Sequence, residues 1–275
     1  MLGAVAIVTP AGARAGGPAI GYVKAEHYAK ARRRPTLYFP GNLFDGRRQT
    51  VTCWEWQEGR PPRLEIGFKR RPKVTELRIV NGDQRSTAHF ERARRVARLR
   101  IREPGYERTV DLPDARRAVA VKLDPPLRSE RVVFEVVATS GSGPLVCLSD
   151  VQLRQRGRPL TAAGRLKYNP TKEPNVGAWA AGPEGAPERF LTLYHDGTFR
   201  WVYAPNDPDE RGRTITGKWE ARRRTLILTH GRKMHHLRLR RAVREDETGE
   251  PYRVLVLTGD SPFAAEYRDR WIGAL

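Results

Sequence analysis

Apolar and polar residues alternate with a period of two in many short runs, and this pattern constrains the fold more than any other feature. Successive side chains of a β-strand point to opposite faces, so a period of two predicts strands with one buried face. In the first half the runs are residues 63–68, 74–79, 97–101, 119–123, 132–137 and 145–153. Turn residues separate them and no amphipathic helix interrupts them, which predicts a β-sandwich or jelly roll.

The alternation resumes after residue 175 in three pairs of runs. The first pair, 190–194 and 198–203, is joined by His195-Asp196-Gly197, and Asp-Gly between two such runs is a hairpin signal. The other pairs are 217–221 with 225–228, and 236–240 with 252–257. Such a meander predicts a small antiparallel barrel. We also predict a short helix over residues 266–275.

Changes in composition and in the alternation pattern along the chain predict the domain boundaries. We predict a sandwich over residues 36–156, a polar linker rich in Gly and Pro over 157–174, and a barrel over 175–275. Residues 1–15 resemble a signal peptide, with an apolar run and a small-x-small site at Ala13-Arg14-Ala15, although a positive n-region is missing. This predicts a periplasmic or secreted protein with no transmembrane segment in the mature chain. The alternative is a disordered N-terminal region, continuous with the extension over 16–35.

The net charge of +20 favours polyanionic partners, nucleic acid among them. The arginines lie in most segments and do not form one block, and a GC-rich genome would produce the same excess without selection for binding. No P-loop, dinucleotide fingerprint, nucleophile elbow or zinc-finger spacing is present. The sequence therefore favours a binding protein over an enzyme.

Ordered short motifs in the first half carry a family resemblance. They are Pro40-Gly41-Asn42-Leu43-Phe44-Asp45-Gly46, Asn81-Gly82, Arg95-Val96-Ala97-Arg98-Leu99 and Cys147-Leu148-Ser149-Asp150-Val151. This order resembles the discoidin-like modules, also called coagulation-factor type-C or galactose-binding-like domains, whose bacterial variety is associated with glycan binding. The resemblance implies a jelly-roll sandwich that recognises a carbohydrate or cell-envelope glycan at its loop end. The chain departs from the family pattern at Arg47, Asp83 and Asp150.

The second half is similar to lipocalin-like, or calycin-like, barrels. The likeness rests on Gly177-Ala178-Trp179 and on the strand, Asp-Gly turn and Phe of residues 190–199. It implies that Trp179 is buried and structural.

The discoidin-like resemblance implies that Cys53 and Cys147 can lie side by side, and export would favour a disulfide between them; two buried free thiols are the alternative. It also implies a calcium site made by Asp45, Asp150 and nearby carbonyl groups. The alternative is that Asp45 only forms an Asx turn, and Arg47 beside it opposes cation binding.

Three side chains are candidates for ligand binding. Trp54 and Trp56 share one strand face, and their rings could stack on a sugar; packing in the core is the alternative. Arg85 follows Asn81-Gly82 on a predicted loop, where it could bind a ligand or simply be solvated.

Overall fold

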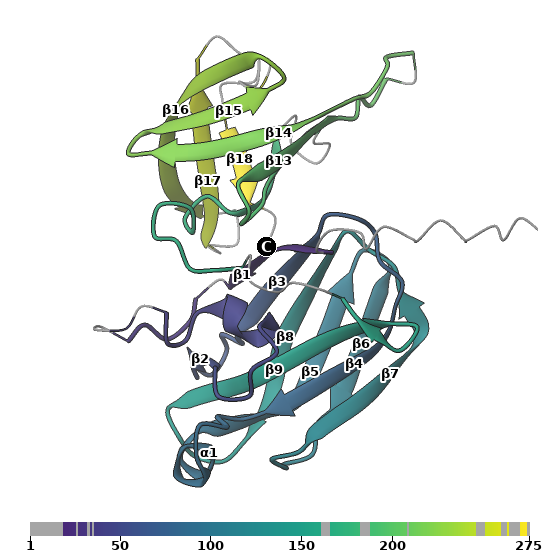
Figure 1. Cartoon of the computed structure of the whole chain (residues 1–275), viewed down its shortest axis with the longest axis vertical. Coiled ribbons are helices and arrows are strands. Elements are labelled where there is room, and N and C mark those ends of the chain that lie inside the picture. The colour runs from purple at the N-terminus through teal and green to yellow at the C-terminus, as the bar shows by residue number, and fades with distance from the viewer. Residues whose placement is uncertain are drawn as a thin grey trace, which may run out of the picture.

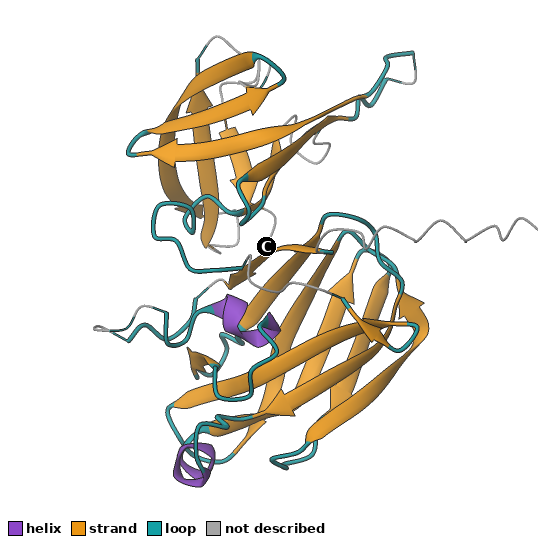
Figure 2. Cartoon of the chain, in the orientation of Figure 1, coloured by secondary structure: helices purple, strands orange, loops and turns teal. Residues whose placement is uncertain are grey.

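The computed structural model shows a protein built almost entirely of β-strands (Figure 2). The residues described are 19–25, 27–31, 34, 36–160, 166–181, 188–207, 209–245, 251–259, 263 and 270–273. The predicted fold class is confirmed: a β-sandwich is followed by a closed antiparallel barrel (Figure 1). The candidate signal peptide over residues 1–15 lies outside the described residues. Within the described part, none of the helices has the length and apolar character needed to cross a bilayer.

The sandwich contains ten strands, one 3₁₀ helix and one short α-helix. They are β1 (Ile20–Ala25), η1 (Pro40–Phe44), β2 (Thr52–Glu55), β3 (Arg63–Phe68), β4 (Val74–Asn81), α1 (Thr87–Arg92), β5 (Arg94–Glu103), β6 (Tyr106–Asp111), β7 (Ala118–Leu127), β8 (Arg131–Ser140), β9 (Leu145–Gln155) and β10 (Arg158–Pro159).

The strands follow the order β1-β3-β8-β5-β9-β4-β7, with β6 beside β5, and β2 and β10 beside β9. The link between β5 and β9 is short and parallel, at Arg94–Val146 and Arg95–Cys147. It joins two layers, one containing β3, β8 and β5 and the other β9, β4 and β7 (Figure 1). The apolar faces predicted from the alternation, such as Leu64 and Ile66 on β3, meet between the layers as the core.

The barrel is formed by β11 (Gly177–Ala181), β12 (Arg189–Leu193), β13 (Thr198–Tyr203), β14 (Arg213–Arg222), β15 (Thr225–His230), β16 (Lys233–Glu245), β17 (Pro251–Thr258) and β18 (Arg270–Gly273). Each strand pairs with the next, and β18 closes the barrel against β11. The helix predicted over residues 266–275 is therefore wrong where β18 lies. The backbone N–H and C=O groups of β18 find hydrogen-bond partners on β11 and β17, and the sequence of one segment does not show such distant partners.

The boundary predicted between extension and sandwich also needs correction. The prediction of an N-terminal extension over residues 16–35 is wrong for residues 20–25, because β1 pairs with β3 and all six of its residues are buried. The pattern was hidden because β1 is covered on both faces, so it lacks the alternation of a half-exposed strand.

Tyr22 on β1 connects the two domains. Its ring belongs to the core cluster of the barrel, while its hydroxyl donates a hydrogen bond to the buried Glu65 of the sandwich. Gly67 makes room for the ring, since a Cβ there would lie 1.8 Å from a ring carbon of Tyr22. Trp179 is buried as predicted, and its indole N–H donates to the carbonyl of Asn175 at 2.9 Å.

Candidate functional site

The disulfide predicted between Cys53 and Cys147 is present. The two residues are direct partners in the antiparallel pairing of β2 with β9, and their Cα atoms lie 4.2 Å apart. Both are buried in a small apolar cluster with Ala29, Val51 and Ala93. The bond therefore attaches the short strand β2 to the long strand β9.

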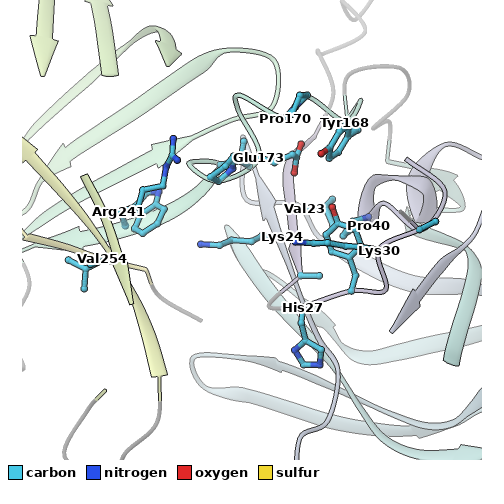
Figure 3. A pocket seen from close by; sticks show the side chains of 17 residues that line it. Val23, Lys24, His27, Lys30, Pro40, Tyr168, Pro170, Glu173, Arg241 and Val254 are labelled. Atoms are coloured by element: carbon cyan, nitrogen blue, oxygen red, sulfur yellow. The ribbon is translucent and has the colours of Figure 1, made fainter. Parts of the chain in front are cut away.

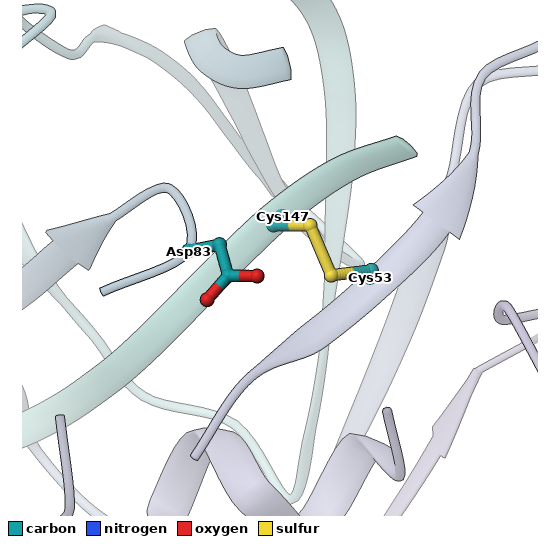
Figure 4. Close-up of side chains that lie close together, drawn as sticks. All are labelled: Cys53, Asp83 and Cys147. Carbon is teal, nitrogen blue, oxygen red and sulfur yellow. A yellow bond between two sulfur atoms is a disulfide. The ribbon is translucent and has the colours of Figure 1, made fainter. Parts of the chain in front are cut away.

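Asp83 lies directly beside this disulfide (Figure 4), with a carboxylate oxygen within 4.8 Å of both sulfur atoms. The trio does not form a metal site, because each sulfur atom is bonded to the other and offers no thiolate. Asp83 is only 3% exposed, and a carboxylate at that depth requires hydrogen-bond partners. The next few residues of the same loop supply them.

Arg85 is the partner of Asp83. Its Nε donates to Asp83 Oδ1 at 2.9 Å and its Nη2 donates to Oδ2 at 2.5 Å, a bidentate arrangement. The pKa of Arg85 is raised, chiefly by the hydrogen bonds to Asp83. The guanidinium also lies 5.7 Å from the ring centre of Tyr38, which packs on the cluster around the disulfide. We call Tyr38, Asp83 and Arg85 the Arg85 cluster.

Arg85 directly precedes the N-cap of α1, and α1 lies at the end of the sandwich away from the barrel (Figure 1). Ser86 caps α1 by accepting a hydrogen bond from the backbone N–H of His89, which fixes the loop that carries Asp83 and Arg85. Arg85 and Tyr38 are half-buried, so part of each side chain faces solvent. The cluster therefore presents an oriented cation beside an aromatic ring at the protein surface.

The two tryptophans proposed as sugar-stacking residues have different environments. Trp54 is 1% exposed and belongs to the core of the sandwich, so its ring has no free face for a ligand. The core-packing alternative is the one that the structure supports for Trp54. Trp56 is half-buried at the edge of that core, with the Arg94 guanidinium 6.0 Å from its ring centre.

Asp45 and Asp150 come close enough for their charges to interact. Asp45 Oδ1 accepts hydrogen bonds from the backbone N–H of Arg47 at 2.8 Å and from Thr50 Oγ1 at 2.9 Å, the geometry of an Asx turn. Asp150 is buried: its Oδ2 accepts from Gln152 at 3.2 Å, but Oδ1 has no hydrogen-bond partner among the described residues.

The pKa of Asp150 is raised, mainly by burial and further by the negative charge of Asp45. A buried carboxylate oxygen without a partner, next to a second carboxylate, fits a hard cation that takes oxygen ligands. The Asx turn of Asp45 is compatible with a cation, because the turn uses only Oδ1 of the carboxylate and leaves Oδ2 as a possible ligand. The positive charges of Arg48 and Arg78 also act on Asp150 and oppose a cation, so calcium at this site stays a prediction.

Arg85 is a candidate from the sequence, whereas its partners Asp83 and Tyr38 are not predicted from it. A signal was present at Asp83, where the chain departs from the family pattern. Nothing in the local sequence indicates Tyr38, because its place beside Arg85 depends on the path of the loop that leads to η1.

No known protein-family profile matches the sequence, and no curated protein sequence matches it either. Several solved structures are similar over about half of the chain. The family 32 carbohydrate-binding module of C. perfringens NanJ, in complex with galactose, is 15% identical, with 47% of this chain and 89% of that one covered and a TM-score of 0.34.

A pectin-binding carbohydrate-binding module is 11% identical over 53% of this chain and 98% of that one, with a TM-score of 0.38. An F5/8 type C domain from Bacteroides fragilis is 10% identical over 48% of this chain and 89% of that one, with a TM-score of 0.34. At these identities and TM-scores the likenesses assign neither a ligand nor residue roles. The lipocalin-like resemblance of the barrel stays a prediction.

Proposed function

We propose that this protein binds carbohydrate without transforming it, and that the Arg85 cluster at the loop end of the sandwich is the contact site. The observation that carries the proposal is the bidentate pair between Arg85 and the buried Asp83, placed beside the Tyr38 ring. The ordered motifs that resemble discoidin-like modules point to the same ligand class.

The chemistry of the cluster suits a sugar. A guanidinium whose orientation is fixed by a carboxylate binds neighbouring hydroxyl oxygens with little loss of entropy on binding. An aromatic ring next to it offers an apolar surface to the C–H face of a pyranose. Trp56 is a further candidate for contact with the sugar on the same module. Trp54 packs in the core and is not a candidate.

We infer that the protein works in the periplasm or outside the cell. The disulfide between Cys53 and Cys147 supports this, because such bonds persist in oxidising compartments and are rare in the cytosol. The candidate ligand is therefore a glycan of the cell envelope or its surroundings.

A glycan array with the full chain tests the proposed function. We expect selective binding to a group of related glycans, and a loss of at least tenfold in affinity for Arg85→Gln, since the variant removes an oriented charge-assisted donor. Arg222→Gln is the matched control, because Arg222 is an exposed arginine on the barrel that pairs with Glu220. Binding that does not exceed a scrambled-glycan control, or equal binding by both variants, would contradict the proposal.

The alternative of a polyanion or nucleic-acid binder is separated by salt. Binding through dispersed arginines falls steeply as the salt concentration rises, with little preference for sequence. The affinity for a neutral glycan at the Arg85 cluster should change less than about threefold between roughly 50 and 500 mM salt. Salt strongly screens exposed charges over this range. A steep loss over this range for every ligand on the array would favour the polyanion alternative.

We also propose that Asp150, Asp45 and neighbouring carbonyl groups hold calcium as a structural ion. Calcium bound there would neutralise the two carboxylates and fix the loop after η1. We expect the melting temperature to rise on addition of calcium and to fall in chelator, because an ion that binds only the folded state stabilises it. Asp150→Asn should abolish the difference and Asp111→Asn, at an exposed site, should keep it. An unchanged melting temperature in the unmodified protein would contradict the site.

A further inference from the structure

The junction between sandwich and barrel is fixed by several contacts. The backbone N–H of His195, in the turn between β12 and β13, donates to the carbonyl of Gly21 on β1 at 3.1 Å. Lys69 forms an ion pair with Asp196, and Arg200 forms another with Glu130 at 2.6 Å. Together with Tyr22, these contacts hold the two domains in one arrangement. A pocket between them is therefore formed before any ligand binds.

Such a pocket exists, with a volume of about 700 Å³, within the range of about 300–1,000 Å³ typical of small-molecule sites. Figure 3 shows Lys24 extending from the sandwich side, Arg241 and Val254 on the barrel side, and Tyr168 and Glu173 from the connecting segment. The site is separate from the Arg85 cluster, with which it shares no residue.

The pocket is basic. Lys24, Lys30 and Arg241 line it, and Glu173 is the one acidic residue among its described lining residues. Arg241 is oriented by its Nε, which donates to Asn175 Oδ1 at 2.8 Å. The Lys24 ammonium lies 4.4 Å from the ring centre of Trp179, and Lys24 as a whole residue is 6% exposed, so its charge is poorly hydrated.

Glu173 adds little negative charge to the pocket at neutral pH. Burial raises its pKa to about 8. Its Oε1 lies 3.4 Å from His195 Nδ1, and burial lowers the pKa of His195 to about 4. The other ring nitrogen of His195 contacts the carbonyl of Val23 at 3.2 Å; a carbonyl only accepts, so the proton is on Nε2 and Nδ1 carries a lone pair. A protonated Glu173 faces that lone pair.

The rest of the wall is mainly apolar. The tyrosine rings of residues 28 and 168 and the indole of Trp179 contribute flat surfaces. The aliphatic wall is made by Val23, Ala25, Pro40, Val176, Ala242 and Val254. Apolar walls with basic groups fit a ligand that combines one negative charge with an apolar body, because each part then has a matching surface.

We propose that this pocket between the domains binds a small organic carboxylate with an aromatic or similarly flat apolar body. The carboxylate is bound by Lys24 and Arg241, and the apolar body lies against the aromatic and aliphatic walls. A carboxylate fits the planar fork of the Arg241 guanidinium. Inorganic phosphate has the charge without the apolar body, and a neutral amide has the body without the charge.

Calorimetric titration of the full chain with phenylacetate, phenylacetamide and inorganic phosphate tests this assignment. Phenylacetate should bind at least tenfold more tightly than either of the others. Lys24→Met and Arg241→Gln should each weaken phenylacetate binding at least tenfold and leave phenylacetamide unchanged. Lys122→Met, at an exposed site on β7, is the matched control and should bind like the unmodified protein.

Arg241 is exposed, so Arg241→Gln reports on the site even where loss of the buried Lys24 impairs folding. Phosphate that binds as tightly as phenylacetate would overturn the proposal in favour of a plain anion site. Three other results would overturn it as well: equal affinity for phenylacetate and phenylacetamide, full affinity for phenylacetate in Arg241→Gln, or no heat of binding at about 10 mM phenylacetate. That concentration is on the order of ten times a millimolar Kd. None of these outcomes bears on glycan binding at the Arg85 cluster, so failure of one proposal is distinguishable from failure of the other.

Discussion

Glu173 and His195 are two titratable side chains that burial holds in their neutral forms. The pKa of Glu173 is raised to about 8 and that of His195 is lowered to about 4, in both cases mainly because the charged form loses its hydration. The other titratable or charged side chains that line the pocket with Glu173 are Lys24, His27, Tyr28, Lys30, Tyr168 and Arg241. The pair makes stability depend on pH.

As the pH rises from 6.5 to 8, the contribution of this pair comes increasingly from Glu173 alone. Unfolded His195 is half protonated at pH 6.5 and loses its remaining charge above it, whereas Glu173 is ionised when unfolded and largely protonated when folded. The folded state binds more protons, so the free energy of unfolding falls as pH rises, by at most about 1.4 kcal/mol per pH unit. Between about pH 4.5 and 6.5 the opposite shift of His195 offsets this fall.

We therefore expect Glu173→Gln to flatten the fall in melting temperature between pH 6.5 and 8, because glutamine does not titrate. Glu220→Gln, at an exposed site on the barrel, should keep the slope of the unmodified protein. Thermal melts at half-unit pH steps measure both. The same slope in Glu173→Gln and in the unmodified protein would show that Glu173 is ionised in the folded state.

At the scale of elements, β2 is a short strand at the margin of the sandwich sheet. It has four residues and pairs only with β9. The disulfide holds it there and closes a separation of 94 residues, worth up to about 4–5 kcal/mol in the chain-entropy model. Because Asp83 packs against the sulfur atoms, the bond also supports the Arg85 cluster.

Replacing Cys53 and Cys147 by alanine should lower the free energy of unfolding by about 2–5 kcal/mol and weaken glycan binding, since both the strand and Asp83 lose support. Urea unfolding and the glycan array measure the two effects. Intact mass after alkylation without reductant is the independent check. Two alkylated cysteines in protein recovered from an oxidising compartment would contradict the bond.

At the scale of the molecule, sandwich and barrel share a side chain. Tyr22 belongs to a strand of the first domain and to the core of the second, and Gly21 beside it permits close packing, since a Cβ there would lie 2.4 Å from the Tyr194 ring. Residues 36–156 expressed alone would lack β1 and leave an edge of β3 unpaired. The two domains are therefore expected to depend on each other for stability.

Tyr22→Ala should cost about 3–5 kcal/mol, the usual range for truncating a buried aromatic side chain, and should destabilise both domains. Tyr22→Phe keeps the ring but removes the hydrogen bond to Glu65, and should cost about 1–3 kcal/mol. Hydrogen exchange of β3 and β12 amides reports on each domain separately. Faster exchange in β3 alone would contradict the coupling.

The sequence by itself determined the strands with one exposed face and the turns between them. The alternation at 198–203 or 225–228 is a local property, set by side chains that point to opposite faces of the same strand. The burial of Trp179 and the pairing of Cys53 with Cys147 were also predictable, because the family resemblance supplied the positions.

Only the tertiary structure decided the rest. β1 is covered on both faces and β18 gains its hydrogen bonds from β11 and β17, so neither shows a pattern of its own. Asp83 with Arg85 and Glu173 with His195 are contacts between loop side chains, and their geometry depends on how the strands stack. A local pattern records which face of a segment is apolar; it does not record which distant segment will cover that face.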